Sequence, residues 1–274
     1  MTFRALLALP LAGLLAACTA PGPAPEAEPG PEPVTYDHYV ALGDSFAAMG
    51  SRSATTTGPF ECFRSVDNYP SLVLADDRVT AGEDVTCSSA VTADIPGQAA
   101  ALTPDTDLVT LSIGGNDIRF GEIAACFRRA LTEPLDCPTL LDAPVSEQLT
   151  TLPGRLDEVH ALISETSPDA RVIGTGYLPL VASGECPELA TIPEEHRAWA
   201  VDLTDRINAV VREAAERNDA EFVLPTDASA HSACAEPGER WADISGEETD
   251  AYPMHPTPLG QRAMADAVGD QISK

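Results

Sequence analysis

Residues 39–50 read Y-V-A-L-G-D-S-F-A-A-M-G. The four apolar residues at the start of this stretch are typical of a short buried strand. Gly43 ends the apolar run, and an acid and a hydroxyl follow it at Asp44 and Ser45. Both side chains are common in turns and at helix N-termini, where their oxygens accept backbone N–H bonds. The stretch therefore predicts a strand that ends in a turn and leads into a helix.

The rest of the chain repeats this alternation of short apolar runs and amphipathic stretches. Strands separated by helical patterns require crossover connections, which place the strands parallel in one sheet. The predicted fold class is α/β, a three-layer α/β/α sandwich around a central parallel sheet. The predicted strands are Tyr39–Leu42, Val85–Cys87, Leu108–Ser112, Val172–Thr175 and Glu221–Leu224. The predicted helices are Tyr69–Ala75, Ile118–Ala130, Val145–Glu165, Glu194–Arg217 and Pro258–Ile272, with long loops at 49–68, 126–144 and 181–198.

The composition of the chain limits its possible partners. With 274 residues it can form one sizeable core, and we expect a single folded domain at 36–274. Its 43 acidic and 16 basic residues give a formal net charge of −27. Such a surface repels nucleic acid and anionic membranes, because binding either depends on cationic side chains. Since 44% of the residues are hydrophobic, the acidity indicates a solubilised globular domain and not disorder.

Residues 1–17 have the pattern of a bacterial export signal. Arg4 precedes a thirteen-residue apolar stretch, which is too short to span a membrane because a spanning helix needs about 20 residues. The stretch runs into L-A-A-C at 15–18, which resembles the lipobox of bacterial lipoproteins, so Cys18 is predicted to carry the lipid. An ordinary secretory signal, with Cys18 incidental, is the alternative. Residues 18–35 are rich in proline and glutamate and predict an extended linker.

The remaining six cysteines favour disulfides, because export places them in an oxidising environment and their number is even. Spacing alone leaves their connectivity open. No C-x-x-C pair or Cys/His cluster indicates a metal site, so no metal ligand is predicted. We expect consecutive pairing, which joins Cys62 to Cys87, Cys126 to Cys137 and Cys186 to Cys234.

A second informative stretch, L-S-I-G-G-N-D at 111–117, also lies at the end of a predicted strand. Because the carboxyl ends of parallel strands meet at one edge of a sheet, we expect Asn116 and Ser45 to lie at the same edge. The two glycines allow a sharp turn and close approach to a ligand, and Asn116 can donate an N–H to a negative oxygen. An ordinary turn capped by Asn116 is the alternative.

A histidine approaches the sheet from the other end of the chain. His255 lies in a proline-stiffened loop just before the last predicted helix, whereas His160 is expected to be an exposed helix residue. Imidazole can remove the proton of a serine hydroxyl near neutral pH, and the oxyanion that then forms needs fixed N–H donors. Ser45 as nucleophile, His255 as base and Asn116 as donor would supply all three roles.

These three stretches, in this order, resemble the GDSL, or SGNH, hydrolases. The resemblance covers most of residues 36–274, and T-C-S-S-A at 86–90 with H-P-T-x-x-G at 255–260 is most similar to the actinobacterial secreted lipases and esterases. It implies a flavodoxin-like sandwich, no metal or organic cofactor, and a Ser–His mechanism through an acyl-serine intermediate. It also implies an oxyanion hole made by the backbone N–H groups of Ser45 and Ser89 and by the Asn116 amide.

The sequence departs from the family pattern at three positions. Phe46 stands where G-D-S-L has its leucine, and Ser89 stands where the family has a glycine. The family's D-x-x-H is missing, because the residue three before His255 is Tyr252. Members of this branch orient the histidine with a main-chain carbonyl, which would be that of Tyr252, and Asp250 is the less favoured candidate. We therefore expect a Ser–His dyad.

The predicted function is that of an exported serine ester hydrolase, an esterase or lipase acting on small-molecule, lipid or polysaccharide esters. The protein is expected to be a monomer that is either secreted or held at the outer face of the cell membrane only through the lipid on Cys18. The alternative is a non-catalytic acyl- or sugar-binding lipoprotein on the same fold, which the missing D-x-x-H and the serine at position 89 keep open.

Overall fold

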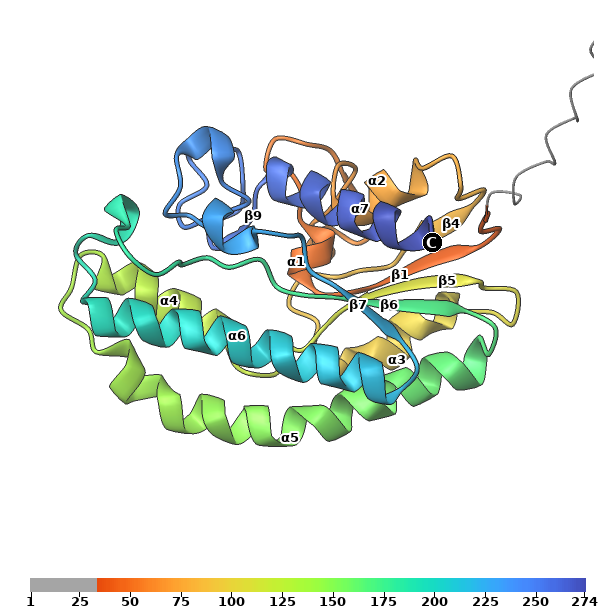
Figure 1. The fold of residues 1–274 in the computed structure, drawn as a ribbon, viewed down its shortest axis with the longest axis horizontal. Coiled ribbons are helices and arrows are strands. Elements are labelled where there is room, and N and C mark those ends of the chain that lie inside the picture. Colours follow the sequence, from red (N-terminus) through yellow and green to blue (C-terminus); the bar gives the residue numbers. More distant parts are fainter. Residues whose placement is uncertain (1–33) are drawn as a thin grey trace, which may run out of the picture. The chain divides into compact units, whose positions relative to one another are not determined.

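The computed structural model describes residues 34–274, and a five-stranded sheet forms their centre (Figure 1). The predicted signal peptide at 1–17, Cys18 and nearly all of the linker at 18–35 lie outside the described residues. The strands follow the order β4-β1-β5-β6-β7, and all neighbours are parallel. In this order β1 and β5 are adjacent, and neither is an edge strand. These strands are β1 (Tyr39–Gly43), β4 (Gly82–Asp84), β5 (Leu108–Ser112), β6 (Arg171–Thr175) and β7 (Glu221–Val223).

Alternate side chains of the strands belong to two apolar cores, one on each face of the sheet. On β1, Val40 and Leu42 pack into one core, and Tyr39 and Ala41 pack into the other. All four residues are fully buried. A strand that is covered on both faces has no polar side, which is why this stretch reads as a continuous apolar run.

Helices cover both faces of the sheet (Figure 1). The pair α2 and α7 packs on one face, and α3, α4, α5 and α6 cover the other. This arrangement confirms the predicted three-layer α/β/α sandwich. The helices are α1 (Ser45–Ala48), α2 (Tyr69–Leu74), α3 (Ile95–Gln98), α4 (Phe120–Ala130), α5 (Cys137–Thr166), α6 (Glu194–Arg217) and α7 (Pro258–Ile272), and two small hairpins pair β2 (Thr56–Thr57) with β3 (Arg64–Ser65) and β8 (Ala242–Asp243) with β9 (His255–Pro256).

The second predicted strand was wrong, because the strand lies just before the predicted Val85–Cys87. The observed strand β4 is polar and half-exposed, as an edge strand can be, since only one of its sides is paired. The apolar residues after it still follow β1, where the amide of Val85 donates to the carbonyl of Ala41 at 3.1 Å. The apolar run therefore marked the place where the chain leaves the sheet.

The expected loop at 126–144 was also wrong, because most of it is helical. Helix α4 continues to Ala130, and α5 begins at Cys137. The side chain of Asp136 caps α5 by accepting from the amide of Thr139 at 3.0 Å. Prolines made this region look irregular, but one of them lies in the first turn of α5, where a helix tolerates the missing N–H. Pro144 and Pro153 lie inside the helix, which curves along the sheet (Figure 1).

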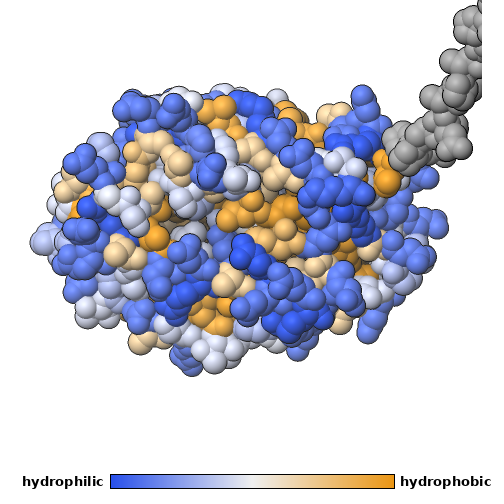
Figure 2. Space-filling view, in the orientation of Figure 1, coloured by the Kyte–Doolittle hydropathy of each residue, from blue (hydrophilic) through white to orange (hydrophobic). Residues whose placement is uncertain are grey.

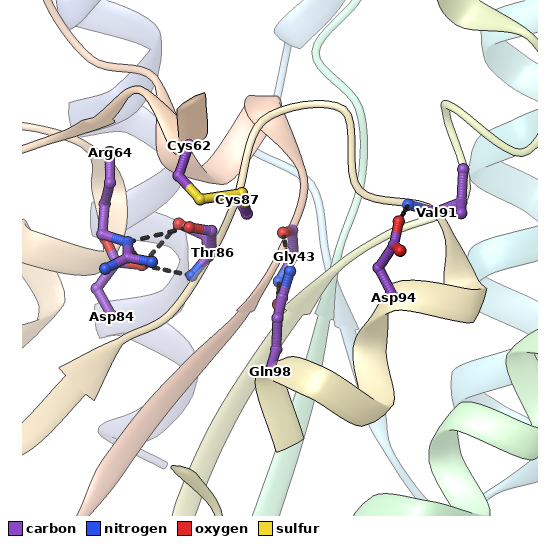
Figure 3. Close-up of a disulfide and its surroundings, with 9 residues drawn as sticks. All are labelled: Gly43, Cys62, Arg64, Asp84, Thr86, Cys87, Val91, Asp94 and Gln98. Atoms are coloured by element: carbon purple, nitrogen blue, oxygen red, sulfur yellow. Dashed lines mark hydrogen bonds and ion pairs between the residues drawn. A yellow bond between two sulfur atoms is a disulfide. The ribbon is translucent and has the colours of Figure 1, made fainter. Parts of the chain in front are cut away.

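The three disulfides have the expected pairing. Cys62–Cys87 joins the turn at 60–62 to the segment after β4, and Cys126–Cys137 joins α4 to α5. Cys186–Cys234 connects two long loops. The first disulfide lies beside Arg64, which donates to the carbonyl of Thr86 at 3.0 Å (Figure 3). It therefore fastens the loop at 49–68 to the segment that leads to Ser89.

Hydrophilic side chains cover much of the face seen in Figure 2, with apolar patches between them. This distribution agrees with the acidic composition of the chain, because charged side chains occupy the outer sides of the covering helices. Within residues 34–274, no helix has the length and apolar character needed to cross a membrane.

Candidate active site

Ser45 is the first residue of α1, directly after the turn that ends β1. The Asp44 side chain caps this helix by accepting from the amide of Phe46 at 3.0 Å. The Asp44 amide donates to the carbonyl of Ser112 at 2.8 Å and so ties the end of β1 to the end of β5. Gly43 is required in this turn, because a Cβ there would lie 2.5 Å from the Ser112 carbonyl oxygen.

The same turn is held from below by Gln98 of α3, a contact that the sequence did not reveal (Figure 3). The amide of Gly43 donates to Gln98 Oε1 at 2.7 Å, and Gln98 Nε2 donates to the carbonyl of Gly43 at 2.9 Å. Both backbone groups of the glycine are therefore satisfied by one side chain. These two hydrogen bonds fix the position of the turn that carries Ser45.

The structure brings Ser45 and His255 together from 210 residues apart in the sequence. The distance between His255 Nε2 and Ser45 Oγ is 2.8 Å. This is hydrogen-bond distance, and it is also the distance across which a base can take a proton from a hydroxyl. Both groups lie where the sequence predicted them, at the carboxyl edge of the parallel sheet.

The carbonyl that meets the other ring nitrogen belongs to Pro253, so the predicted Tyr252 carbonyl was wrong. His255 Nδ1 lies 2.8 Å from the Pro253 oxygen, whereas the Tyr252 carbonyl accepts from the amide of His255 at 3.2 Å. Met254, between the proline and the histidine, has a φ of 64°, and this left-handed turn brings the nearer carbonyl under the ring. Asp250 does not substitute for a family acid, since its carboxylate pairs with Ser53.

These contacts determine the tautomer of His255. A carbonyl oxygen only accepts hydrogen bonds, so Nδ1 must carry the proton that it donates to Pro253. In the neutral ring Nε2 is then unprotonated and accepts from the hydroxyl of Ser45. Burial of the ring lowers the pKa of His255 to about 4, and the hydrogen bond to Pro253 opposes this shift only in part. The rings of Phe46 and Phe120 lie 5.4 and 5.8 Å from the imidazole and supply much of this apolar surrounding.

The predicted oxyanion donors lie on two loops that are tied to each other. Asn116 Nδ2 donates to the carbonyl of Ala90 at 3.0 Å, and the carboxylate of Asp117 accepts from the amide of Thr92 at 3.0 Å. The amide of Asn116 carries a second N–H, for which no partner occurs within residues 34–274. Ser89 has a φ of 67°, the left-handed conformation that glycine adopts most easily. A glycine, which the family pattern would place here, could adopt this φ without strain.

An apolar cavity opens beside the pair. It is bordered by Phe46, Gly115 and Met254, which are the sequence neighbours of Ser45, Asn116 and His255. From there it extends between α4 and α6, where nearly all of its surface is apolar. The rest of its lining includes Ile118, Phe120, Ile123, Ala124, Phe127, Leu203 and Ile207. Such a cavity suits a hydrocarbon chain and offers few partners to a sugar.

Two residues that support the site were not predicted from the sequence: Tyr177, which follows β6, and Gln98, which lies on α3. Tyr177 follows β6 at the same edge and lines the cavity, so the rule that located Ser45 and Asn116 could also have found it. Gln98 gave no such signal.

His160, expected to be exposed, is buried on α5, because α5 turns this side of the helix inward. Among the described residues, no three His, Cys, Asp or Glu side chains gather as a metal site requires.

Known proteins share both the sequence and the fold. The sequence profile of the GDSL-like lipase/acylhydrolase family matches residues 41–263. Lipase 2 of Streptomyces coelicolor is 33% identical over 253 residues, which cover 85% of this chain and 85% of the relative. The extracellular lipase of Streptomyces rimosus has a TM-score of 0.75 at 29% identity, covering 85% of this chain and 99% of that structure. Phospholipase A1 of Streptomyces albidoflavus has a TM-score of 0.74 at 29% identity, covering 86% and 99%.

The match spans all three stretches that first suggested a hydrolase, from the end of β1 to the start of α7. The relatives named lipase also cover most of the chain and are themselves covered over most of their length. The predicted enzyme class is therefore confirmed as carboxylic ester hydrolase. The chain belongs to the GDSL-like lipase/acylhydrolase family.

Proposed function

We propose that the protein is an exported esterase or lipase in which Ser45 and His255 act as a nucleophile–base dyad. The observation that carries this proposal is the 2.8 Å contact between Ser45 Oγ and His255 Nε2. It is supported by the tautomer, since the Pro253 carbonyl keeps the proton on Nδ1 and leaves Nε2 free to accept. A neutral imidazole at working pH follows from the low pKa of His255, which is about 4.

In the reaction, Ser45 Oγ attacks the acyl carbon as His255 Nε2 takes the hydroxyl proton. The tetrahedral intermediate collapses when His255 gives this proton to the leaving alkoxide, and an acyl-serine forms. Water then attacks the acyl-serine, again with His255 as base, and the acid is released. The Pro253 carbonyl holds the ring throughout, but it stabilises the imidazolium less than a carboxylate would.

The oxyanion of the intermediate needs donors that are already in place. We assign this role to the backbone N–H groups of Ser45 and Ser89 and to Asn116 Nδ2. The tie between Asn116 and Ala90 supports the assignment, because it links the loops that carry the last two donors. Donors fixed before the reaction stabilise the developing charge without reorganising.

The apolar cavity supports an ester with a hydrocarbon acyl chain as the substrate. Its lining by α4 and α6 residues favours such a chain over the acetyl group of a polysaccharide. Two of the similar proteins are a lipase and a phospholipase A1, which agrees with this choice. The proposed substrate class is thus an acyl ester of a lipid or a related small alcohol.

Export is proposed from the sequence of residues 1–35, with Cys18 as the lipid attachment site and residues 36–274 as the hydrolase domain. The three disulfides support an oxidising location. Palmitate incorporation by producing cells tests the anchor, since it should be lost in Cys18→Ala. Unlabelled soluble wild-type protein would point to plain secretion.

The dyad is tested with a fluorophosphonate probe and a p-nitrophenyl ester. Wild type should be labelled, and Ser45→Ala should not, whereas Ser88→Ala, a nearby serine, should label normally. Ser45→Ala and His255→Ala should each reduce turnover by at least ~10³-fold, as for other nucleophile–base pairs. A wild type that is not labelled would contradict the proposal and favour a non-catalytic binding lipoprotein.

A further inference from the structure

Tyr177 connects the two turns on which the proposed chemistry depends. Its hydroxyl lies 2.6 Å from Asp44 Oδ2 and 2.7 Å from the amide nitrogen of Gly115. Asp44 precedes the proposed nucleophile by one residue, and Gly115 precedes Asn116 by one residue. All three bonded residues are buried. One hydroxyl thus joins the segments that follow β1, β5 and β6.

The direction of these bonds is determined by the groups involved. The amide of Gly115 can only donate, so the hydroxyl oxygen of Tyr177 accepts there. The hydroxyl proton is then donated to Asp44 Oδ2, while Asp44 Oδ1 accepts from the amide of Phe46. The two partners of the hydroxyl therefore have different roles: Gly115 donates to its oxygen, and Asp44 accepts its proton.

Tyr177 is itself held in place by α6. The side chain of Asn208 accepts from the backbone amide of Tyr177 at 2.7 Å and donates to its carbonyl at 3.0 Å. The tyrosine ring packs edge-on against Phe46 at a centroid distance of 4.9 Å. A Cβ at Gly115 would lie 3.0 Å from this ring, so the glycine turn sits directly against it. The hydroxyl therefore occupies a position set from both sides.

We propose that Tyr177 is a positioning residue that sets the distance between the nucleophile Ser45 and the oxyanion donor Asn116. This inference rests on the proposed function of those two residues. Asp44 and Gly115 would be free to shift relative to each other without the hydroxyl, and the turns would carry Ser45 and Asn116 with them. Misplacement of an oxyanion donor weakens binding of the transition state more than binding of the substrate.

The test is Tyr177→Phe, which removes the hydroxyl and keeps the ring that lines the cavity. We expect kcat for p-nitrophenyl esters to fall ~10- to 100-fold, the scale of a small misplacement in an active site. KM should change by less than about twofold, because the cavity is intact. The loss should be the same for short and long acyl chains. A substitution that only lowered the folded fraction would also reduce turnover at unchanged KM, so kcat is expressed per site labelled by the fluorophosphonate, where such a substitution has no effect.

Tyr39→Phe is the matched control, because its buried hydroxyl bonds to Thr110 at 2.6 Å within the sheet. It should lower the melting temperature much as Tyr177→Phe does and leave kcat unchanged. Asp44→Ala is the second variant. It removes the acceptor of the Tyr177 hydroxyl proton and also the cap on the amide of Phe46.

If Tyr177 acts through its bond to Asp44, the double variant Tyr177→Phe/Asp44→Ala should lose about as much kcat as Asp44→Ala alone. Additive losses, or a Tyr177→Phe enzyme with wild-type kcat, would overturn the inference. If Tyr177→Phe does not fold, a wild-type kcat in Asp44→Ala would do the same. Fluorophosphonate labelling of wild type separates the two proposals: a labelled wild type with a normal Tyr177→Phe enzyme rejects only the role of Tyr177.

Discussion

His255 is held by a main-chain carbonyl where related enzymes with D-x-x-H would have an acid. The Pro253 oxygen fixes which nitrogen carries the proton, but it adds no negative charge beside the ring. The ring is also enclosed by Phe46 and Phe120. This enclosure keeps the imidazole neutral, which suits a base that must accept a proton from Ser45, whereas the bond to Pro253 acts in the opposite direction.

This environment predicts an unusually acid-tolerant enzyme. A base is active when neutral, so kcat/KM should hold as the pH falls below 6.5 and decline toward the His255 pKa of about 4. Phe120→Ala should admit water, raise this pKa toward its ordinary value and shift the decline to higher pH. Phe60→Ala, an exposed aromatic, is the control. Asp44 is a second group that titrates at moderate pH, because burial raises its pKa to about 7. A decline that moves to higher pH in Phe120→Ala therefore assigns the decline to His255. An unmoved acid limb in Phe120→Ala would argue against this origin.

Ser89 shows a conformational cost at a position that offers only its backbone. Its φ of 67° is unfavourable for a side chain that has a Cβ. Ser89→Gly should therefore raise the free energy of unfolding by up to about 1 kcal/mol and leave kcat unchanged, because the N–H remains. Ser88 has no positive φ, so Ser88→Gly should lower stability. Urea unfolding and ester turnover measure both variants, and a large loss of activity in Ser89→Gly would exclude a purely backbone role.

Among the elements, α4 and α6 line the cavity that is proposed to hold the acyl chain. Ala124 on α4 lines the cavity, whereas Ala125, the next residue, is exposed. Ala124→Phe should fill the part of the cavity that Ala124 lines and reduce kcat/KM for octanoate esters at least ~10-fold. Acetate esters should lose little, because only the longer chain needs that space. Ala125→Phe should change neither. A uniform loss across chain lengths in Ala124→Phe would show that the acyl chain binds elsewhere.

For the molecule as a whole, two histidines, the buried His160 and the half-buried His255, link stability to pH. Burial lowers the pKa values of His160 and His255 to about 4. The unfolded chain then binds more protons than the folded one between pH 6.5 and about 4. The stability that these histidines contribute is present above pH 6.5 and is lost as the pH falls through this window. Asp44 acts in the opposite direction, because its raised pKa favours the folded state at low pH.

His160 separates this effect from catalysis, since it lies on α5 and has no part in the site. His160→Leu removes one titrating group and should flatten the decline in unfolding free energy between pH 6.5 and 4.5. The difference from wild type is at most about 3 kcal/mol, at about 1.4 kcal/mol per pKa unit. Urea unfolding at several pH values measures it, with kcat at pH 7 as the check that the site is intact. Parallel curves for both proteins would contradict the assignment.

The elements could be predicted where their signals were local. Both α6 and α7 begin and end at the predicted residues, because apolar spacing and the cap at Thr257 mark them within a few positions. The edge strand β4 and the start of α5 were missed, since a half-exposed strand has little apolar signal and prolines within a helix resemble a loop. The site was predicted to the extent that it lies at strand ends.

The three layers, the family and the residues at the carboxyl ends of β1 and β5 could be predicted from the chain alone, because hydrophobic periodicity and strand direction depend on short stretches. The folded molecule was needed to show that Ser45 and His255 lie 2.8 Å apart, that Pro253 orients the ring, and that Tyr177 joins the two turns. These contacts link segments far apart in the chain or depend on one left-handed residue. Packing of the complete core fixes such distances, and no short stretch contains that information.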